Sequence, residues 1–168
     1  MRLPSPVAGE GLGEGAITAL YITPAAAAPM QAVPQVTLIA ECGIAGDRYA
    51  EGHGTFSNWP KDHELTLIEE EVLKAVETEY GIVLAPGETR RNITTRGVRL
   101  NPLVGRRFRV GGALCQGTRS CEPCAHLERV TNRPGLARLL AGRGGLRAVV
   151  LEGGLVRVGD TICVESEE

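Results

Sequence analysis

The stretch of the chain with the most reactive side chains is Arg119-Ser120-Cys121-Glu122-Pro123-Cys124-Ala125-His126. Pro123 suits the first position of a helix, because a backbone N–H there would have no helical partner. This predicts Cys124 in a first helical turn, where backbone N–H groups and the nearby Arg119 favour the thiolate. Such a thiolate can attack sulfur, bind a soft metal or carry a persulfide. His126, two residues further on, is the candidate for assisting the thiol.

The Cys-x-x-Cys pair also admits other interpretations. A structural zinc site needs four ligands, so Cys121, Cys124 and His126 would need one more, and the chain has no second Cys-x-x-Cys pair. A thioredoxin-like oxidoreductase places its pair early, in a βαβ unit, whereas this pair follows a β-rich stretch late in the chain. A disulfide within the pair as an off-cycle state stays open, and so does burial of both cysteines as small hydrophobic side chains. The remaining cysteines lie in apolar, strand-like contexts and are expected to be structural: Cys42, Cys115 and Cys163.

Composition and charge restrict the class of protein. At 168 residues the chain fits one domain with a single core. Its formal net charge of -2 gives no overall attraction to nucleic acid or to an anionic membrane. The first residues lack the apolar segment of a secretory signal, and the odd number of cysteines, 5, indicates free thiols. We expect a cytoplasmic protein without nucleic-acid or membrane partners, with a flexible lead at 1–14 and a single domain at 15–165.

Short strands separated by turns that contain Gly and Pro predict a mostly β fold. This pattern favours a closed or partly open β-barrel over a doubly wound sheet. Strands are expected at Ala16–Thr23, Val33–Ala40, Leu65–Ile68, Arg107–Val110, Leu114–Thr118, Leu146–Glu152, Val156–Val158 and Thr161–Val164. The polar segment from Ile44 to Lys61 has no lasting period and is expected to be a long surface loop.

One medium helix and one or two short helices complete the expected fold. The medium helix runs from Glu69 to Gly81, because its first turn is acidic and a glycine ends it. Apolar residues recur there at helical spacing on one expected face: Val72, Leu73, Val76 and Tyr80. The short helices are expected within Cys121–Arg129 and at Leu136–Leu140.

Five separated blocks of the sequence resemble the MOSC family, of which the C-terminal domain of molybdenum cofactor sulfurases is a member. The blocks are Gly43–Arg48, Arg90–Gly97, Leu103–Gly111, Cys121–Cys124, and the pair Gly144-Gly145 with its continuation to Gly159-Asp160. Each block alone is a weak signal, but their order and spacing across residues 15–164 are similar to a stand-alone bacterial MOSC domain.

The resemblance implies a β-barrel and a cysteine, Cys124 here, that carries sulfur as a persulfide or contacts molybdenum. It also implies a molybdenum-pterin cofactor as ligand or acceptor, whose phosphate or pterin charge-assisted hydrogen bonds could hold. The candidate cofactor-binding residues are Arg90, Arg91, Asn92, Arg96 and Arg119. A solvated barrel rim is an equally open role for the arginines.

In the sulfurase relatives an attached pyridoxal phosphate (PLP) domain generates the persulfide, and this chain is too short to contain one. The resemblance therefore implies that the chain binds no PLP itself. It implies a separate PLP-dependent cysteine desulfurase as sulfur donor and a molybdoenzyme or its cofactor as acceptor. Two alternatives stay open: a non-catalytic molybdenum cofactor-binding module with Cys124 as the metal ligand, and detoxification of N-hydroxylated compounds.

Overall fold

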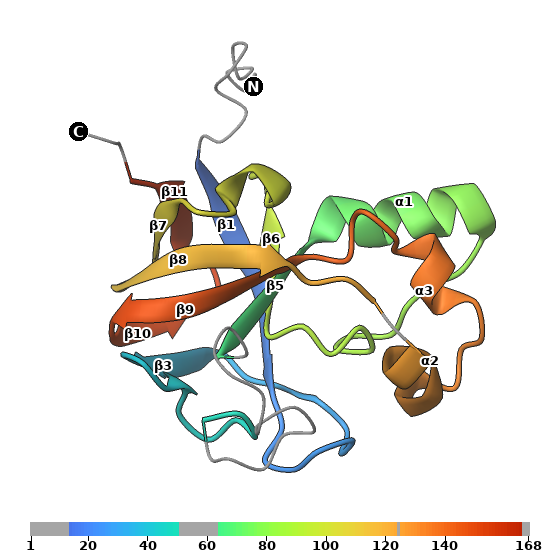
Figure 1. Ribbon diagram of the computed structural model, residues 1–168, viewed down its shortest axis with the longest axis horizontal. Coiled ribbons are helices and arrows are strands. Elements are labelled where there is room, and N and C mark those ends of the chain that lie inside the picture. The colour runs from blue at the N-terminus through green and yellow to red at the C-terminus, as the bar shows by residue number, and fades with distance from the viewer. Residues whose placement is uncertain (1–13, 51–63, 124, 166–168) are drawn as a thin grey trace.

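The structure is a computed structural model that describes residues 14–50, 64–123 and 125–165, with the backbone alone for residues 125 and 126. Seven of its strands close into a barrel in the order β1, β11, β7, β8, β9, β5, β6 and back to β1 (Figure 1). Their bounds are β1 Glu14–Ile22, β5 Leu65–Glu69, β6 Ile93–Arg96, β7 Arg107–Val110, β8 Ala113–Ser120, β9 Leu146–Glu152 and β11 Thr161–Val164. The expected closed β-barrel is confirmed.

Strand pairing in the barrel is antiparallel except between β5 and β6, which run parallel. A parallel pair needs a long crossover, and the chain between β5 and β6 supplies it with the helix α1, Glu70–Tyr80. A second, three-stranded sheet has the order β10, β3, β4, with bounds Gly154–Arg157, Gln35–Ile39 and Gly43–Ile44. The two-residue strand β2, Gln31–Ala32, extends the barrel sheet beside β1.

Apolar side chains from every barrel strand fill the interior. Alternation makes this possible, since β7 reads exposed, buried, exposed, buried along its four residues and turns Phe108 and Val110 inward. Full burial of one such side chain contributes roughly 1.5–3 kcal/mol. The fully buried members of this core include Ile17, Leu20, Leu65, Leu67, Ile93, Phe108, Leu146 and Ala148.

The helices lie together on one side of the barrel (Figure 1). Helix α1 ends where Gly81 adopts φ 69 and its N–H donates to Glu77 O at 2.8 Å, as the expected glycine stop requires. The short helices α2, Ala125–Thr131, and α3, Leu136–Leu139, pack with α1 around a small apolar cluster of Val72, Val76, Leu127, Leu136 and Leu140. A 3-10 turn, η1, spans Asn101–Leu103.

Several local expectations are confirmed and others are wrong. The strand at Thr161–Val164 and the helix ending at Gly81 occur as expected. Tyr80 is 55% exposed, so it does not belong to the buried face of α1. The segment expected as a surface loop from Ile44 to Lys61 instead begins in the strand β4 and contains Asp47 and Arg48, which are both buried. Strand β6 was not expected at all.

Two expectations concern residues beyond those described. Residues 1–13 of the expected flexible lead and residues 51–63 of the expected loop lie outside the described ranges. In the part of the chain that the structure describes, no helix is long and apolar enough to span a membrane.

Candidate functional site

The Arg90–Gly97 block, the Cys121–Cys124 block and the Gly144-Gly145 pair meet at the side chain of Arg91. The Arg91 guanidinium is buried, and its Nε donates to Gly144 O at 2.9 Å. Its Nη2 donates to Cys121 O at 3.1 Å, and its Nη1 donates to Thr89 O at 3.3 Å. Three backbone carbonyls from three segments therefore share one cation, which holds these segments together.

The two glycines of this junction are required by close backbone approach. A Cβ added at Gly144 would overlap Cys121 O and the ring of Pro123. A Cβ added at Gly145 would overlap Leu67 O, and Gly145 has φ +117, which L side chains rarely adopt. The pair therefore allows the start of β9 to lie against both β5 and the segment that leads to Cys124.

Cys121 lies inside this junction. Its side chain is 1% exposed, and its backbone N–H donates to Gly145 O at 2.8 Å. Cys121 therefore packs as a small hydrophobic side chain. The predicted catalytic and metal-binding residue Cys124 lies outside the described residues, and so does the side chain of His126, whose backbone belongs to α2.

Asn92 holds the start of β6 against its neighbours. Its Oδ1 accepts from the N–H and from the hydroxyl of Thr66, both at 3.1 Å. Its Nδ2 donates to Tyr21 O at 3.1 Å and to Asp47 Oδ1 at 3.5 Å. The side chain is 2% exposed, so these contacts satisfy an amide that would otherwise be costly to bury.

Asp47 and Arg48 form a buried ion pair beside Asn92. Asp47 Oδ1 accepts from Arg48 Nη1 at 3.1 Å and from the N–H of Thr23 at 3.1 Å. Asp47 Oδ2 accepts from the N–H of Tyr49 at 3.3 Å, and the Arg48 guanidinium lies 4.6 Å from the centre of the Tyr49 ring. The glycine-aspartate block at Gly43–Arg48 therefore supplies a wall of the site in which a buried carboxylate and a buried guanidinium are paired.

Arg90 occupies the rim of a hollow of about 340 Å³. Its backbone adopts φ 64, a left-handed conformation that is uncommon for a residue other than glycine. Its Nη1 donates to Ala28 O at 2.7 Å, while its Nη2 is buried and has no hydrogen-bond partner among the described residues. Burial, with the positive charge of Arg48 adding to it, lowers the pKa of Arg90 to about 10.

Arg147 is a further cation of this region that the sequence did not single out. Its neighbours Leu146 and Ala148 belong to the core, so its own side chain lies on the outer face of β9. It pairs in register with Arg119 on β8 and with Thr66 on β5. Arg147 Nε is buried and, within the described ranges, has no hydrogen-bond partner.

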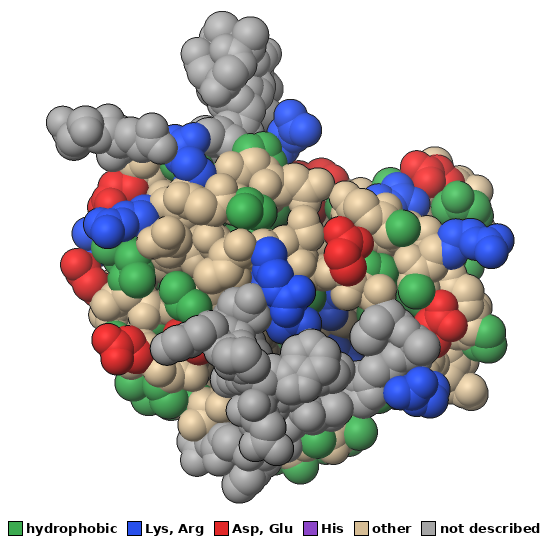
Figure 2. Space-filling view, in the orientation of Figure 1, with side chains coloured by type: hydrophobic (Ala, Val, Ile, Leu, Met, Phe, Trp, Pro, Cys, Tyr) green, Lys and Arg blue, Asp and Glu red, His purple; other side chains and the backbone are tan. Residues whose placement is uncertain are grey.

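The other predicted cofactor-binding arginines lie in different places. Arg119 is exposed and stands two residues before Cys121, on the same side of the barrel as Arg147. Arg96 is exposed at the opposite end of β6 from Asn92, beside Ala16 of β1. Lys and Arg side chains gather near the middle of one face of the molecule, where β8 and β9 cross β5 (Figure 2). Strand register therefore places Arg119 next to Arg147 and leaves Arg96 away from the junction.

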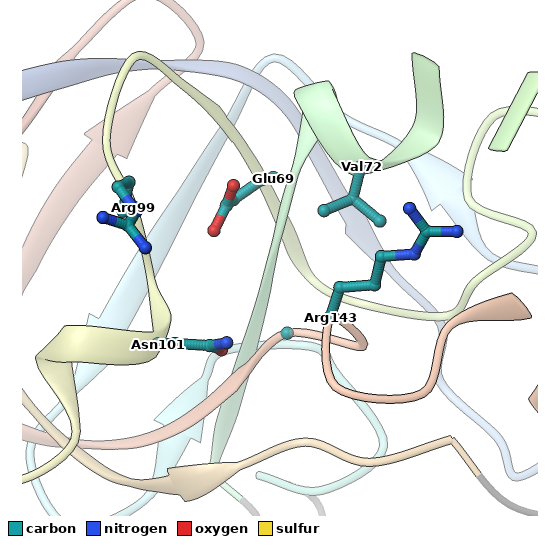
Figure 3. Close-up of a pocket in the computed structure, with 6 residues that line it drawn as sticks. Glu69, Val72, Arg99, Asn101 and Arg143 are labelled. Atoms are coloured by element: carbon teal, nitrogen blue, oxygen red, sulfur yellow. The ribbon is translucent and has the colours of Figure 1, made fainter. Parts of the chain in front are cut away.

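A smaller hollow of about 180 Å³ lies on the other side of Gly145 (Figure 3). The carboxylate of Glu69 lies in it and accepts from the N–H of Leu100 at 2.9 Å. The Arg143 guanidinium points away from it and donates to Glu79 Oε1 at 3.1 Å. Arg99 also lines this hollow, but the Glu69 carboxylate within it would repel an anion.

The thiol of Cys115 is excluded as a nucleophile. It lies fully inside the barrel, and burial raises its pKa to about 12. Residues 14–50, 64–123 and 125–165 bring together no group of three or more His, Cys, Asp or Glu side chains that could hold a metal ion. The expected structural role of Cys115 agrees with this burial.

Comparison with known proteins gives a family match and several similar folds. Residues 49–163 match the family model of the MOSC domain, a range that contains four of the five blocks and begins after Gly43–Arg48. The YuaD protein from Bacillus subtilis has 20% identity and a TM-score of 0.75, over 92% of this chain and 97% of that chain. YiiM from Geobacillus stearothermophilus has 18% identity and a TM-score of 0.69, over 90% and 75%. YiiM from Escherichia coli has 21% identity and a TM-score of 0.66, over 91% and 71%. No curated protein matches the sequence.

Proposed function

Because the chain belongs to the MOSC domain family, which is linked to the molybdenum cofactor, we propose that it is a sulfur-carrier domain serving that cofactor. In this proposal Cys124 alternates between a thiol and a persulfide. A separate PLP-dependent cysteine desulfurase supplies the sulfur, and a molybdenum-pterin cofactor, free or within a molybdoenzyme, receives it.

The observation that carries the proposal is the junction at Arg91. The hydrogen bond from Arg91 Nη2 to Cys121 O, at 3.1 Å, fixes the segment that leads into Cys124 beside the start of β6. Arg90, one residue before Arg91, keeps a buried guanidinium nitrogen without a partner in the described part of the chain. The segment that leads to Cys124 and the partly unsatisfied Arg90 guanidinium therefore both adjoin the junction at Arg91.

A phosphate-bearing cofactor fits cationic donors whose hydrogen bonds are not used within the protein. Arg90 meets this condition through Nη2. Arg91 and Asn92 do not, because their side chains already form the hydrogen bonds described above with neighbouring backbone and side chains. We therefore assign Arg90 to contact with the anionic group, and Arg91 and Asn92 to holding the wall in place. When bound, the cofactor would supply a sulfur-liganded molybdenum centre, a soft partner for a cysteine sulfur.

The loading step conserves atoms and electrons. The Cys124 thiolate attacks the terminal sulfur of the persulfide on the donor enzyme. A new sulfur–sulfur bond forms on Cys124, the sulfur–sulfur bond of the donor breaks, and the donor cysteine leaves as a thiolate that takes up a proton. A cation near the attacking sulfur favours the thiolate form and so the rate of transfer.

The test is mass spectrometry of the protein and of its peptides after incubation of the full chain with a cysteine desulfurase and cysteine. We expect a gain of about 32 Da, one sulfur atom, on the Cys124 peptide. Cys124→Ser should abolish the gain, whereas Cys42→Ser, which removes a half-buried thiol elsewhere, should keep it. An unmodified Cys124 in the wild type would contradict the proposal.

The same protein samples distinguish the sulfur carrier from a non-catalytic cofactor-binding module. Stoichiometric molybdenum that survives dialysis, is lost in Cys124→Ser, and is accompanied by no sulfur transfer in the wild type would favour the module with Cys124 as ligand. Sulfur loading with retention of transfer to an acceptor would favour the carrier.

A further inference from the structure

The hollow of about 180 Å³ beside Gly145 is enclosed by three segments of the chain (Figure 3). The first is the end of β5 with the first turn of α1, the second leads into η1, and the third precedes β9. The hollow therefore lies where parts of the chain that are distant in sequence meet. Its lining residues are Glu69, Val72, Arg99, Asn101, Arg143 and Gly145.

Two lining side chains of opposite charge are not paired with each other. The Glu69 carboxylate lies between the side chains of Arg99 and Val72 (Figure 3). Glu69 Oε2 accepts from the N–H of Leu100 at 2.9 Å, and its Oε1 accepts no hydrogen bond from the described residues. Arg99 is exposed and forms no ion pair within the described ranges. Both side chains therefore keep hydrogen-bonding groups for a ligand.

Asn101 adds a neutral acceptor to this pair of charges. Its Nδ2 donates to Gly142 O at 3.1 Å, which leaves its Oδ1 as an acceptor. The Arg143 guanidinium does not compete, because it points away from the hollow and donates to Glu79 Oε1. The hollow thus offers oxygen acceptors from two side chains and one uncommitted guanidinium.

A ligand with a single charge does not match this pattern. The Glu69 carboxylate repels an anion, and the Arg99 guanidinium repels a cation. A zwitterion matches both, because an ammonium group donates up to three hydrogen bonds and suits Glu69 and Asn101. Its carboxylate suits the planar fork of Arg99. A free α-amino acid carries both of these charges at neutral pH.

The volume of the hollow selects small amino acids. About 180 Å³ equals roughly six times the share of one water molecule in the liquid. A ligand of about six or seven non-hydrogen atoms, such as alanine, serine or cysteine, fills this space. Val72, which is buried, supplies an apolar contact for a short side chain.

We infer that this hollow binds a small free α-amino acid, with its ammonium group on Glu69 and Asn101 and its carboxylate on Arg99. Gly145 has no side chain and so lets the ligand approach the backbone before β9. The site does not depend on the proposed function, because the sulfur-carrier role uses none of these residues.

A nuclear magnetic resonance titration of the isotope-labelled full chain with L-alanine tests the site. We expect saturable shifts of the backbone amide signals of Gly145 and of Leu100, whose N–H bonds Glu69. N-acetyl-L-alanine lacks the ammonium group and L-alanine amide lacks the carboxylate, so each should bind at least about tenfold more weakly. L-phenylalanine exceeds the volume of the hollow and should also bind more weakly than L-alanine.

Two variants test the assigned contacts. Glu69→Gln keeps an acceptor for the Leu100 N–H but removes the charge, and we expect at least about tenfold weaker binding of L-alanine. Arg99→Gln should weaken binding at least about fivefold. The matched controls Glu77→Gln on α1 and Arg138→Gln on α3 remove exposed charges and should stay within about twofold. Circular dichroism should show that all variants remain folded.

Several outcomes would overturn this assignment. They are the absence of saturable shifts with L-alanine, shifts that leave Leu100 and Gly145 unaffected, equally tight binding of either blocked derivative, and unchanged affinity in Glu69→Gln. Tighter binding of L-phenylalanine than of L-alanine would also overturn it. The sulfur-loading test stays separate, because Glu69→Gln should still gain about 32 Da on Cys124. Amino acid binding without loading would reject only the sulfur carrier, and loading without binding would reject only this site.

Discussion

Arg91 and Arg147 lie on neighbouring parts of the same barrel side, and they use their guanidinium groups in opposite ways. Arg91 donates to Gly144 O, Cys121 O and Thr89 O. Arg147 has a buried Nε for which the described chain provides no acceptor. The comparison teaches that burial of a cation alone does not mark a binding site. A cation holds the fold where its donors meet acceptors, as those of Arg91 do and the Nε of Arg147 does not.

The largest expected effect is the loss of the Arg91 side chain. Arg91→Met leaves three buried carbonyls without their shared donor, so the free energy of unfolding should fall by about 3–5 kcal/mol. Urea unfolding followed by circular dichroism measures it. Arg138→Met on exposed α3 is the control, with an expected change below about 0.5 kcal/mol. Similar losses of unfolding free energy in both variants would contradict the role of Arg91 in holding the fold together.

Asn92 has a similar stabilising role at the start of β6. Asn92→Ala removes acceptors and donors for Thr66 and Tyr21, and we expect a loss of about 2–3 kcal/mol in unfolding free energy. Asn101→Ala is the matched control, because Asn101 is exposed and donates only to Gly142 O among the described residues. The comparison would fail if the control were as destabilising as Asn92→Ala.

The free energy of unfolding at alkaline pH tests the burial of Cys115 in the barrel interior. Burial raises the pKa of its thiol from 9.0 to about 12, so the unfolded chain releases this proton at lower pH than the folded chain. Its contribution to stability is complete below pH 9 and is lost as the pH rises from about 9 to 12. Between about pH 8 and pH 10.5 we expect a loss of about 2 kcal/mol from this group. Urea unfolding of Cys115→Ala should show a pH slope smaller by that amount, and an unchanged slope would contradict the burial of the thiol.

The smallest expected change in stability is that of Arg147→Met. Removing a guanidinium whose buried Nε has no hydrogen-bond partner in the described part of the chain should leave the free energy of unfolding unchanged or raise it by up to about 1 kcal/mol. Thermal unfolding in buffer without phosphate measures this difference. Destabilisation by about 2 kcal/mol or more would show that Arg147 serves the fold as Arg91 does, and the contrast between them would disappear.

Much of the barrel could be predicted from local patterns. Thr161–Val164 alternates clearly, and the α1 helix combines an acidic first turn with a terminal glycine. Strand β6 was missed because Ile93, Thr94 and Thr95 are all buried, which hides the alternation that marks a strand with one solvated face. Alternation of apolar and polar residues predicts a strand that has one face in water, and it fails for a strand that is covered on both faces.

The site was less predictable, because its contacts join distant parts of the chain. The blocks around Arg91 and Cys121 were identified, but their meeting depends on hydrogen bonds between residues far apart in the sequence. Asn92 is expected from the sequence as a cofactor-binding residue and Asp47 as part of the Gly43–Arg48 block, and neither pattern indicates the contact between them. Arg147 looks like any outward residue of an alternating strand, so no local signal distinguishes it from a solvated arginine.

Closure of the barrel has a consequence for biosynthesis. The ring is completed by pairing Glu14, Gly15 and Ala16 of β1 with Cys163, Ile162 and Thr161 of β11. During translation β1 must therefore wait for a strand almost 150 residues downstream, and until then β1 and β7 each present an open sheet edge. We expect nascent chains halted before Thr161 to be aggregation-prone clients of chaperones, even though most of the barrel has already been synthesised.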